Sequence, residues 1–294
     1  MKCWMRLALC AIIFMVCLLL LTKRHLEDIW DQYSVKDYII DSVFYYIPEE
    51  APDHPEEKEW GDKVIVMARL EEENTNWVQE ELPEWDRAIY IVNPSHRSTE
   101  DPDVLTTPTN KGNEAMAYLT YIIDHYDSLP SNIIFLHSHR SGFFQAWHVD
   151  SPLHDNVAAM RSLDLHYIQT NGYVNLRCNW NPGCKKAHRS NKHVTEEVFN
   201  EIFKGTSTPP LSSLVSDDGE YDKALENQAY LSVPEEVGAA CCAQFAVSRK
   251  QVYKRPRNDY VQIRQWLIDT DRDDAHSGRI MEFLWHIIFG KNSV

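Results

Sequence analysis

Three short apolar runs, separated by one helix-like segment, constrain the fold of this chain more than any other feature. The runs are Val64–Ala68, Ala88–Val92 and Asn132–Leu136. Uninterrupted runs of this length are typical of strands that are covered on both faces. Between the second and third runs, residues 114–126 carry apolar side chains at helical spacing. Strand, helix and strand in this order predict a βαβ crossover and therefore a largely parallel sheet.

The rest of the chain is less regular. Further helices are predicted at Asp155–Gln169, Pro256–Ile268 and Gly278–Phe289, and further strands at Tyr173–Leu176 and Ala243–Val247. Residues 178–236 are rich in loop-forming residues. The predicted fold is therefore a single α/β domain over residues 61–294, a Rossmann-like sandwich with a largely parallel sheet and an irregular second half.

Residues 1–25 predict a membrane segment. The stretch Leu7–Leu21 has no charged residue, and Lys23, Arg24 and His25 follow it. Counted from Cys3 to Thr22 as one helix, the segment rises about 30 Å, enough to cross the hydrocarbon core. A cleaved signal peptide is the competing interpretation, but small residues do not follow the apolar run. We expect an uncleaved signal-anchor and a single-pass protein of the endoplasmic reticulum or Golgi, with its bulk in the lumen.

Residues 26–60 are acidic and contain several prolines, with Pro48–Lys58 at their centre. This composition predicts a stalk that is too polar and too interrupted by proline to pack. The apolar patch Val43–Ile47 is expected to be a strand or a docking contact.

The charge of the chain excludes one class of partner. There are 44 acidic and 29 basic residues, and the formal net charge is −15. Nucleic acid is therefore not expected as a partner, because its phosphates require a basic face. The acidic excess suits a solubilising surface or a site for divalent cations.

Four cysteines lie in the predicted domain: Cys178, Cys184, Cys241 and Cys242. In an oxidising lumen they permit two disulfides. A Pro-Gly turn between Cys178 and Cys184 favours a bridge between these two residues, and four buried thiols are the alternative. A zinc site is less favoured, since neither pair has Cys-x-x-Cys spacing.

His137 and His139 end the third predicted strand and are two residues apart, so they point to one face of it. In open α/β sheets, ligands bind beyond the carboxyl ends of the strands. We expect the two imidazoles to bind a divalent metal, Mn²⁺ or Mg²⁺, with a carboxylate from Asp150 or Asp155. Purely structural histidines are the alternative.

Two further groups are candidates for nucleotide binding. Arg69 and Glu71 follow the first strand, where they would contact a ribose and a phosphate. Lys111 precedes the helix at 114–126, whose N-terminal N–H groups favour an anion. The alternatives are a solvated run of charges and an ordinary helix cap.

Glu282 and His286 are four residues apart on the last predicted helix and are candidates for catalytic base and metal ligand. The helical pattern places Glu282 opposite Ile280, Leu284 and Ile287, on a face that solvent would cover. The same residues as a merely solvated pair are the alternative. Trp147-His148 and Trp180 are candidate platforms for a sugar ring, with core packing as the alternative.

Three blocks carry a resemblance to a known family. Asn110–Pro130, Cys241–Arg249 and Glu282–Gly290 resemble an uncharacterised family of mostly fungal proteins, over about residues 63–290. That family brings no assigned activity. More distantly, the layout is similar to glycosyltransferases of the GT-A type, in which a first strand ends in an acidic turn that binds the nucleotide. In those enzymes a strand-end Asp-x-Asp binds manganese and a late helix supplies an acidic residue. Here His137-Ser138-His139 stands in the place of Asp-x-Asp.

The resemblance implies a membrane-anchored glycosyltransferase whose small-molecule substrate is a nucleotide-sugar donor. Two alternatives remain open at this point. One is a metal-dependent enzyme of another type, such as an oxygenase or cyclase of a biosynthetic pathway. The other is a non-catalytic lumenal protein.

Overall fold

The computed structural model describes residues 2–44, 61–181, 183–184, 193–203, 206 and 233–294. Its centre is a five-stranded sheet with the order β2-β1-β3-β5-β4. Strands β1 (Lys63–Arg69), β2 (Asp86–Ile91) and β3 (Asn132–His137) are parallel. Strand β5 (Phe245–Ser248) runs antiparallel to both β3 and β4 (Tyr173–Asn175). The predicted parallel sheet is confirmed in its centre, and the two later strands make the sheet mixed.

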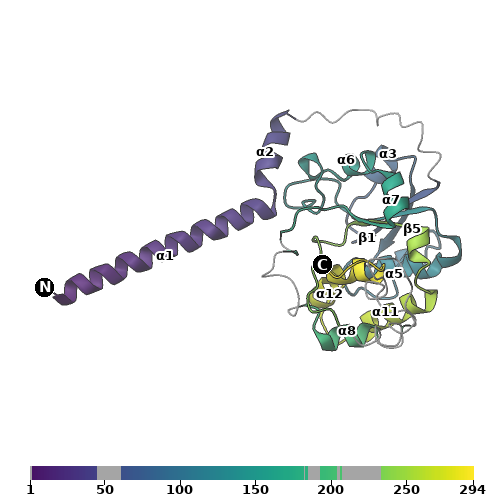
Figure 1. Ribbon diagram of the computed structural model, residues 1–294. Helices are drawn as coiled ribbons and strands as arrows, with labels where there is room; N and C mark the ends of the chain where they lie inside the picture. The colour runs from purple at the N-terminus through teal and green to yellow at the C-terminus, as the bar shows by residue number, and fades with distance from the viewer. Residues whose placement is uncertain (1, 45–60, 182, 185–192, 204–205, 207–232) are drawn as a thin grey trace.

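Helices cover both faces of the sheet, which explains why its strands are apolar throughout (Figure 1). Val64, Val66, Ile133 and Phe135 pack with helices α5 (Ala115–Asp124), α8 (Glu196–Phe203), α11 (Arg257–Asp269) and α12 (Asp274–Ile288). The alternate residues Ile65, Met67, Ile134 and Leu136 pack with α3 (Trp77–Glu81), α6 (Asn156–Arg161) and α7 (Leu165–Asn171). The domain is therefore a three-layer α/β/α sandwich.

The predicted helices are confirmed with two differences. Residues 155–169 do not form one helix, because Asp155 caps α6 and Asp164 caps α7 by accepting a hydrogen bond from the N–H of Tyr167. Helix α8 lies within the segment that was expected to be loop-rich. The remaining short elements are α4 (His96–Thr99), α10 (Arg249–Val252) and the 3₁₀ turns η2 (Tyr126–Ser128) and η3 (Pro152–His154).

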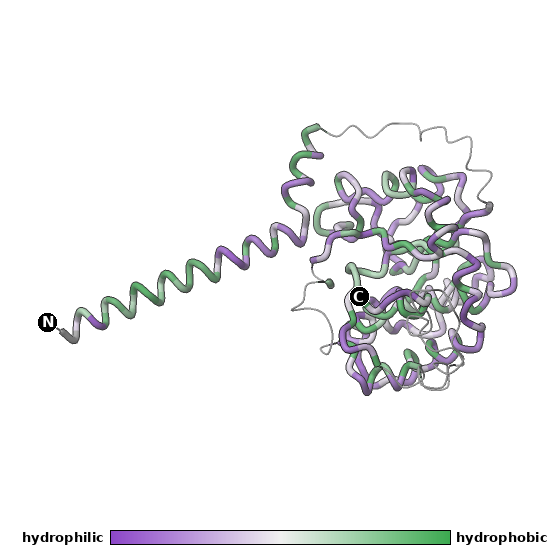
Figure 2. Tube along the Cα trace, viewed as in Figure 1, coloured by the Kyte–Doolittle hydropathy of each residue, from purple (hydrophilic) through white to green (hydrophobic). Residues whose placement is uncertain are grey.

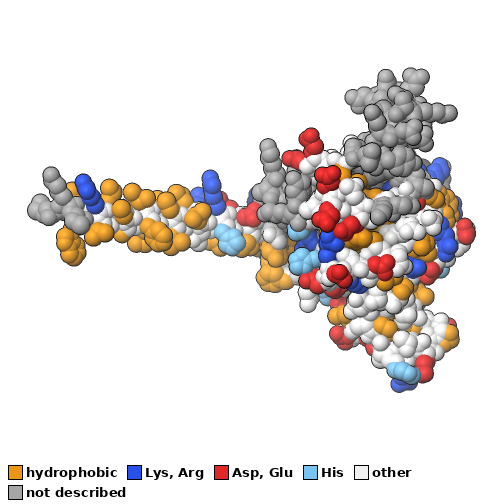
Figure 3. All heavy atoms as spheres, turned by 90° about the horizontal axis from the view of Figure 1, so that it is seen from below, with side chains coloured by type: hydrophobic (Ala, Val, Ile, Leu, Met, Phe, Trp, Pro, Cys, Tyr) orange, Lys and Arg blue, Asp and Glu red, His pale blue; other side chains and the backbone are white. Residues whose placement is uncertain are grey.

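The N-terminal segment is a long helix that extends away from the sandwich. Helix α1 (Lys2–Gln32) contains a stretch, Trp4–Gln32, that is long and apolar enough to cross a membrane, with a mean hydropathy of 2.6 in its most apolar window. Figure 2 shows the apolar part in green and the polar turns in purple where the helix approaches the domain. Exposed apolar side chains cover the outer part of this helix in Figure 3.

The predicted stalk is wrong for residues 26–44. Helix α1 continues through them, and a second helix, α2 (Val35–Phe44), packs against η3. The reason is that the domain supplies partners for the end of α1. Arg177 Nη2 donates to the carbonyl of Gln32 over 2.6 Å, and Asn179 Nδ2 donates to the carbonyl of Asp31 over 2.9 Å. The rest of the expected stalk, including Pro48–Lys58, lies outside the described residues.

We expect α1 to behave as an uncleaved anchor. Full-length protein in microsomes should stay in the pellet after extraction with alkaline carbonate, because the apolar part of the helix would lie in the hydrocarbon core. Mass spectrometry of the mature protein should recover peptides from before Leu21. A mature N-terminus after Leu21, or release of the protein by carbonate, would contradict this prediction.

Candidate functional site

A cavity of about 560 Å³ opens at the carboxyl ends of β1 and β3. Its walls come from segments that are far apart in the sequence: Ala68–Leu70 after β1, His137–His139 after β3, and Asn113-Glu114 before α5. This is the edge of a parallel sheet at which α/β proteins bind their ligands. The predicted position of the site is therefore occupied by a real cavity.

His137 is the last residue of β3 and is the most enclosed imidazole of the cavity. Its Nδ1 lies 2.8 Å from Nδ1 of His148, and its Nε2 lies 3.9 Å from Oε1 of Glu114. Burial lowers the pKa of His137 to about 4 and the pKa of His148 to about 2, and the neighbouring histidines add to both shifts. Both rings are therefore neutral at neutral pH, which is the state in which imidazole binds a metal.

The three predicted metal ligands do not come together. His139 lines the cavity, with its Nε2 3.8 Å from Oε1 of Glu73. Asp150 lies elsewhere, because its carboxylate accepts the backbone N–H groups of Cys178 and Asn179. The groups that lie beside His137 and His139 are instead His148, Glu73 and Glu114. The sequence analysis did not predict them as metal ligands.

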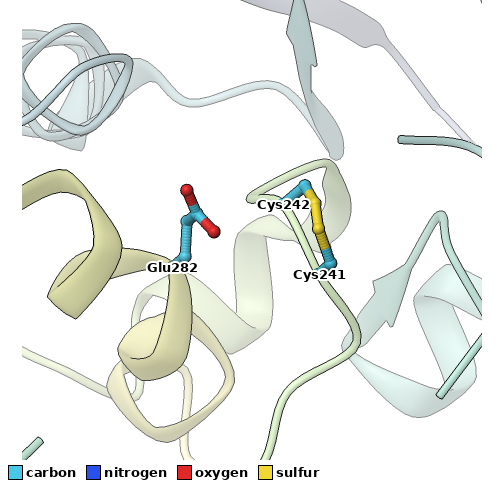
Figure 4. A group of neighbouring side chains, drawn as sticks. All are labelled: Cys241, Cys242 and Glu282. Carbon is cyan, nitrogen blue, oxygen red and sulfur yellow. A yellow bond between two sulfur atoms is a disulfide. The ribbon is translucent and has the colours of Figure 1, made fainter. Parts of the chain in front are cut away.

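The donor atoms of the cavity suit some cations better than others. Imidazole and carboxylate together favour Mn²⁺, Fe²⁺ or Zn²⁺, whereas Mg²⁺ prefers oxygen ligands alone. Among the described residues, however, the group of three ligand atoms that lie within 4.8 Å of one another is Cys241, Cys242 and Glu282 (Figure 4). The two sulfurs of that group are joined in a disulfide, so they are not metal ligands in this state.

Glu114 and Glu282 form a pair of largely buried carboxyl groups, one in the wall of the cavity and one behind it. Their side chains are 14% and 13% exposed, and Glu114 is the member that lines the cavity. Burial and the charge of Glu282 raise the pKa of Glu114 to about 8. Burial raises the pKa of Glu282 to about 7, although Arg279 Nη1 donates to its Oε2 over 2.6 Å and opposes the shift. Carboxyl groups that titrate near neutral pH at a cavity wall are suited to general acid–base chemistry.

The expectation that Glu282 lies on a solvated face is wrong. The pattern within α12 correctly buries Ile280, Leu284 and Ile287, but the side of the helix that carries Glu282 is also covered. The segment around Cys241 lies against it, and the charge of Glu282 acts on Glu114 before α5. His286 is buried too, with Nε2 3.2 Å from the carbonyl of Ser293, and it does not line the 560 Å³ cavity. Its predicted catalytic role has no support in this position.

The residues that were predicted to bind a nucleotide make hydrogen bonds within the loops of the site. Arg69 lines the cavity, but its Nη1 donates to the carbonyls of Leu70, Glu71 and Glu73, which closes the turn after β1. The Glu71 carboxylate accepts the N–H of Ser95 and two serine hydroxyls at the start of α4. Lys111 Nζ donates to the carbonyl of Thr270. These contacts shape the cavity edge and leave Arg69 nearest to a ligand.

The predicted bridge between Cys178 and Cys184 is not formed, since Cys178 is an exposed free thiol. Its loop is fixed by other contacts. Asp150 accepts the N–H groups at its start, and the amides of Asn179 and Asn181 bind α1. The disulfide in the described residues joins Cys241 to Cys242, one of the pairings that the four cysteines of the domain permit.

The carboxyl pair predicts a pH dependence of stability. A carboxyl group whose pKa is raised in the folded state stabilises the fold at low pH, and this contribution is lost as pH rises through the folded pKa. For Glu282, whose pKa rises from 4.5 to about 7, the contribution is on the order of 2–3 kcal/mol. This contribution is lost between about pH 4.5 and pH 7, so we expect the Tm of the wild type to lose about 5–10 °C more than that of Glu282→Gln over that range. Differential scanning calorimetry measures this, with the exposed Glu84→Gln as the matched control. Parallel curves for the wild type and Glu282→Gln would contradict the prediction.

The fold and the site define a class: a mixed α/β protein with an apolar N-terminal helix and a histidine-lined cavity at the carboxyl edge of its parallel strands. Residues 65–294 match the model of a family described as "Protein of unknown function (DUF3431)", and the chain belongs to that family. A search of curated proteins finds no match to the chain. A search of solved structures also finds none.

Proposed function

We propose that the chain is a membrane-anchored, glycosyltransferase-like enzyme that binds a nucleotide-sugar donor in the 560 Å³ cavity. The observation that carries the proposal is the position of Glu114, a carboxyl group with a pKa raised to about 8, in the wall of a cavity at the carboxyl ends of β1 and β3. A transfer of this kind needs a group that removes a proton from the acceptor hydroxyl. Helix α1 would hold the enzyme in a membrane of the secretory pathway, with the domain in the lumen.

Glu114, rather than Glu282, is the proposed base. Glu114 faces the cavity, while Glu282 stands behind it and lines a second, smaller cavity. The role of Glu282 is to raise the pKa of Glu114 through its charge. Removing that charge by Glu282→Gln would therefore move the pH profile of the reaction to lower pH without removing the base.

A diphosphate in this cavity would need a cation, because carboxylates outnumber the basic groups around it. Glu73, Glu114 and Asp274 line the cavity against the single guanidinium of Arg69. His137, His139 and His148, with Glu73, are the residues that would hold a divalent cation such as Mn²⁺. The cation would supply positive charge to the phosphate oxygens. The exposed ring of Phe144 and the ring of Trp147 offer surfaces on which a base or a sugar would stack.

The test is direct binding to full-length protein in detergent. Isothermal titration with nucleotide diphosphate sugars, each with and without Mn²⁺, should show binding that depends on the cation. Wild type, Glu114→Gln and Glu84→Gln should all bind the donor, and Glu114→Gln alone should fail to transfer or hydrolyse it. Absence of binding for all common uridine, guanosine and cytidine diphosphate sugars would refute the proposal.

One observation favours a second candidate, a metal-dependent enzyme that transfers no sugar. Three imidazoles line the cavity, and imidazole-rich sets are typical of Fe²⁺ and Zn²⁺ enzymes. This candidate predicts tight binding of Fe²⁺ or Zn²⁺ and no affinity for any nucleotide sugar, so the same titrations separate the two.

A further inference from the structure

The disulfide between Cys241 and Cys242 lies beside the carboxyl pair of the site. Its sulfurs and a carboxylate oxygen of Glu282 lie within 4.8 Å of one another (Figure 4). Both cysteines are buried, but Cys241 lines the smaller cavity of about 310 Å³ together with Glu282 and Arg279. A thiol that enters this cavity therefore has a path to the sulfur of Cys241.

The backbone at this disulfide has an uncommon conformation. Cys242 has a φ of 106° and Ala243 a φ of 52°, and neither is a glycine. Side chains with a Cβ rarely adopt positive φ unless the surroundings hold them there. A bond between neighbouring cysteines closes a small ring that includes their peptide group, and this ring restrains Cys242. Opening the bond would let Cys242 return to negative φ, and the segment that follows would move.

The segment after Cys242 and Ala243 is hydrogen-bonded to His137. Gln244 is fully buried, and its Oε1 accepts the backbone N–H of His137 over 2.7 Å. The Gln244 carbonyl also accepts the N–H of Leu176 over 3.0 Å, so Gln244 joins the end of β3 to the chain after β4. The backbone of Cys242 also makes a hydrogen bond to His137. A displacement of residues 242–243 therefore reaches His137, and with it the wall of the 560 Å³ cavity, both directly and through Gln244.

We propose that the Cys241–Cys242 disulfide is a reversible redox site for a dithiol reductant, and that reduction releases His137 from Gln244. This inference does not depend on the glycosyltransferase proposal. In an oxidising compartment the bond would form, and a dithiol protein or small molecule would open it.

The reaction is a thiol–disulfide exchange in two steps. The first thiol of the reductant, deprotonated in solvent, attacks Sγ of Cys241, forms a mixed disulfide and expels the Cys242 thiolate. Glu282 gives its proton to that thiolate. The second thiol of the reductant passes its proton to Glu282 and attacks its own partner sulfur, and Cys241 leaves and is protonated from solvent. The reductant loses two electrons and two protons and becomes a disulfide, and the two cysteines gain them.

The experiment uses full-length protein in detergent, purified without reductant. Alkylation with iodoacetamide under denaturing conditions should leave Cys241 and Cys242 unmodified. After treatment of the folded protein with millimolar dithiothreitol, both should be alkylated. Amide exchange at His137, followed by NMR, should then become at least about tenfold faster, since its hydrogen bond to Gln244 is lost.

Two variants complete the test. Cys178→Ser removes an exposed thiol outside the pair and should respond to dithiothreitol as the wild type does. The double variant Cys241→Ser, Cys242→Ser should show fast exchange at His137 with or without dithiothreitol. If the double variant does not fold, the comparison of oxidised and reduced wild type still decides. Free thiols at both positions before reduction, resistance of the folded protein to dithiothreitol, or unchanged exchange at His137 would each overturn the inference.

Discussion

Replacing Glu114 by glutamine should reduce the turnover of a nucleotide-sugar donor by roughly 10²–10⁴-fold, the usual contribution of a general base. The side chain of Glu114 is 14% exposed, lines the cavity and has a pKa raised to about 8. Glutamine keeps its size and removes its ability to take a proton. Steady-state rates with Mn²⁺ and a donor that binds the wild type measure the effect. In the wild type, the rate should rise with pH as the coupled carboxyl pair loses its protons near pH 7–8.

Two control variants make this result specific. Glu84→Gln changes an exposed carboxylate remote from the cavity and should leave the rate unchanged. Glu282→Gln should keep most of the maximal rate but reach it at lower pH, because the charge that raises the pKa of Glu114 is gone. Retained turnover in Glu114→Gln at every pH would exclude Glu114 as the base. A loss in Glu282→Gln that no pH restores would assign the base to Glu282 instead.

Replacing Arg177 by alanine should destabilise the protein by about 3 kcal/mol or more, because the change leaves several buried acceptors without their donor. The Arg177 side chain is fully buried. It donates to the carbonyls of Trp147 and Gln32, and its guanidinium lies 4.8 Å from the centre of the Trp147 ring. For a domain of this size the expected fall in Tm is about 6–12 °C. Thermal unfolding of full-length protein in detergent measures it.

The matched control for this variant is Arg87→Ala, which removes an exposed guanidinium that is bonded to Gln79. Its Tm should change by no more than about 2 °C.

A fragment that begins at residue 60 tests the same contacts by removing the partners that α1 supplies. That fragment lacks Tyr33, whose ring lies 5.0 Å from Trp147, and lacks the partners of Asn179 and Asn181 in α1. It should therefore melt below the full chain, and an equal Tm would show that α1 does not stabilise the domain.

The sequence predicted the centre of the fold because the centre is buried on both sides. Val64–Ala68 and Asn132–Leu136 are uninterrupted apolar runs of strand length, and the helix that precedes the second of them fits a crossover between parallel strands. The predicted position of the cavity followed from the same strands, and His137 and His139 were correctly placed at its edge. The pattern of apolar residues was sufficient to predict burial wherever the residues that cover a side chain are close to it in the sequence.

The prediction failed where burial depended on segments far apart in the sequence. Periodicity along α12 cannot report that Glu282 lies under the segment around Cys241, and so the residue was assigned to a solvated face. Glu114 was overlooked as a candidate acid because its raised pKa comes from burial in the folded domain and from the charge of Glu282, which is distant in the sequence. Residues 26–44 were interpreted as part of a stalk because the partners of this segment, Arg177, Asn179 and Asn181, are about 150 residues away. An isolated segment of that composition would not pack.

Helix α1 continues up to the domain without a break, and this affects which molecules can reach the cavity. With the apolar part of α1 in a bilayer, the height of the domain is set by the helix from Leu21 to Gln32, which rises about 17 Å. A flexible tether would let the domain move through a wide volume above the membrane. A helix whose end is hydrogen-bonded to Arg177 would fix both the distance of the domain from the membrane and its tilt. Phe144 and Trp147, at the mouth of the cavity, contact Tyr33 one residue beyond that helix. The cavity would thereby stay at one height above the bilayer, where molecules held at the membrane surface would reach it by diffusion along the bilayer.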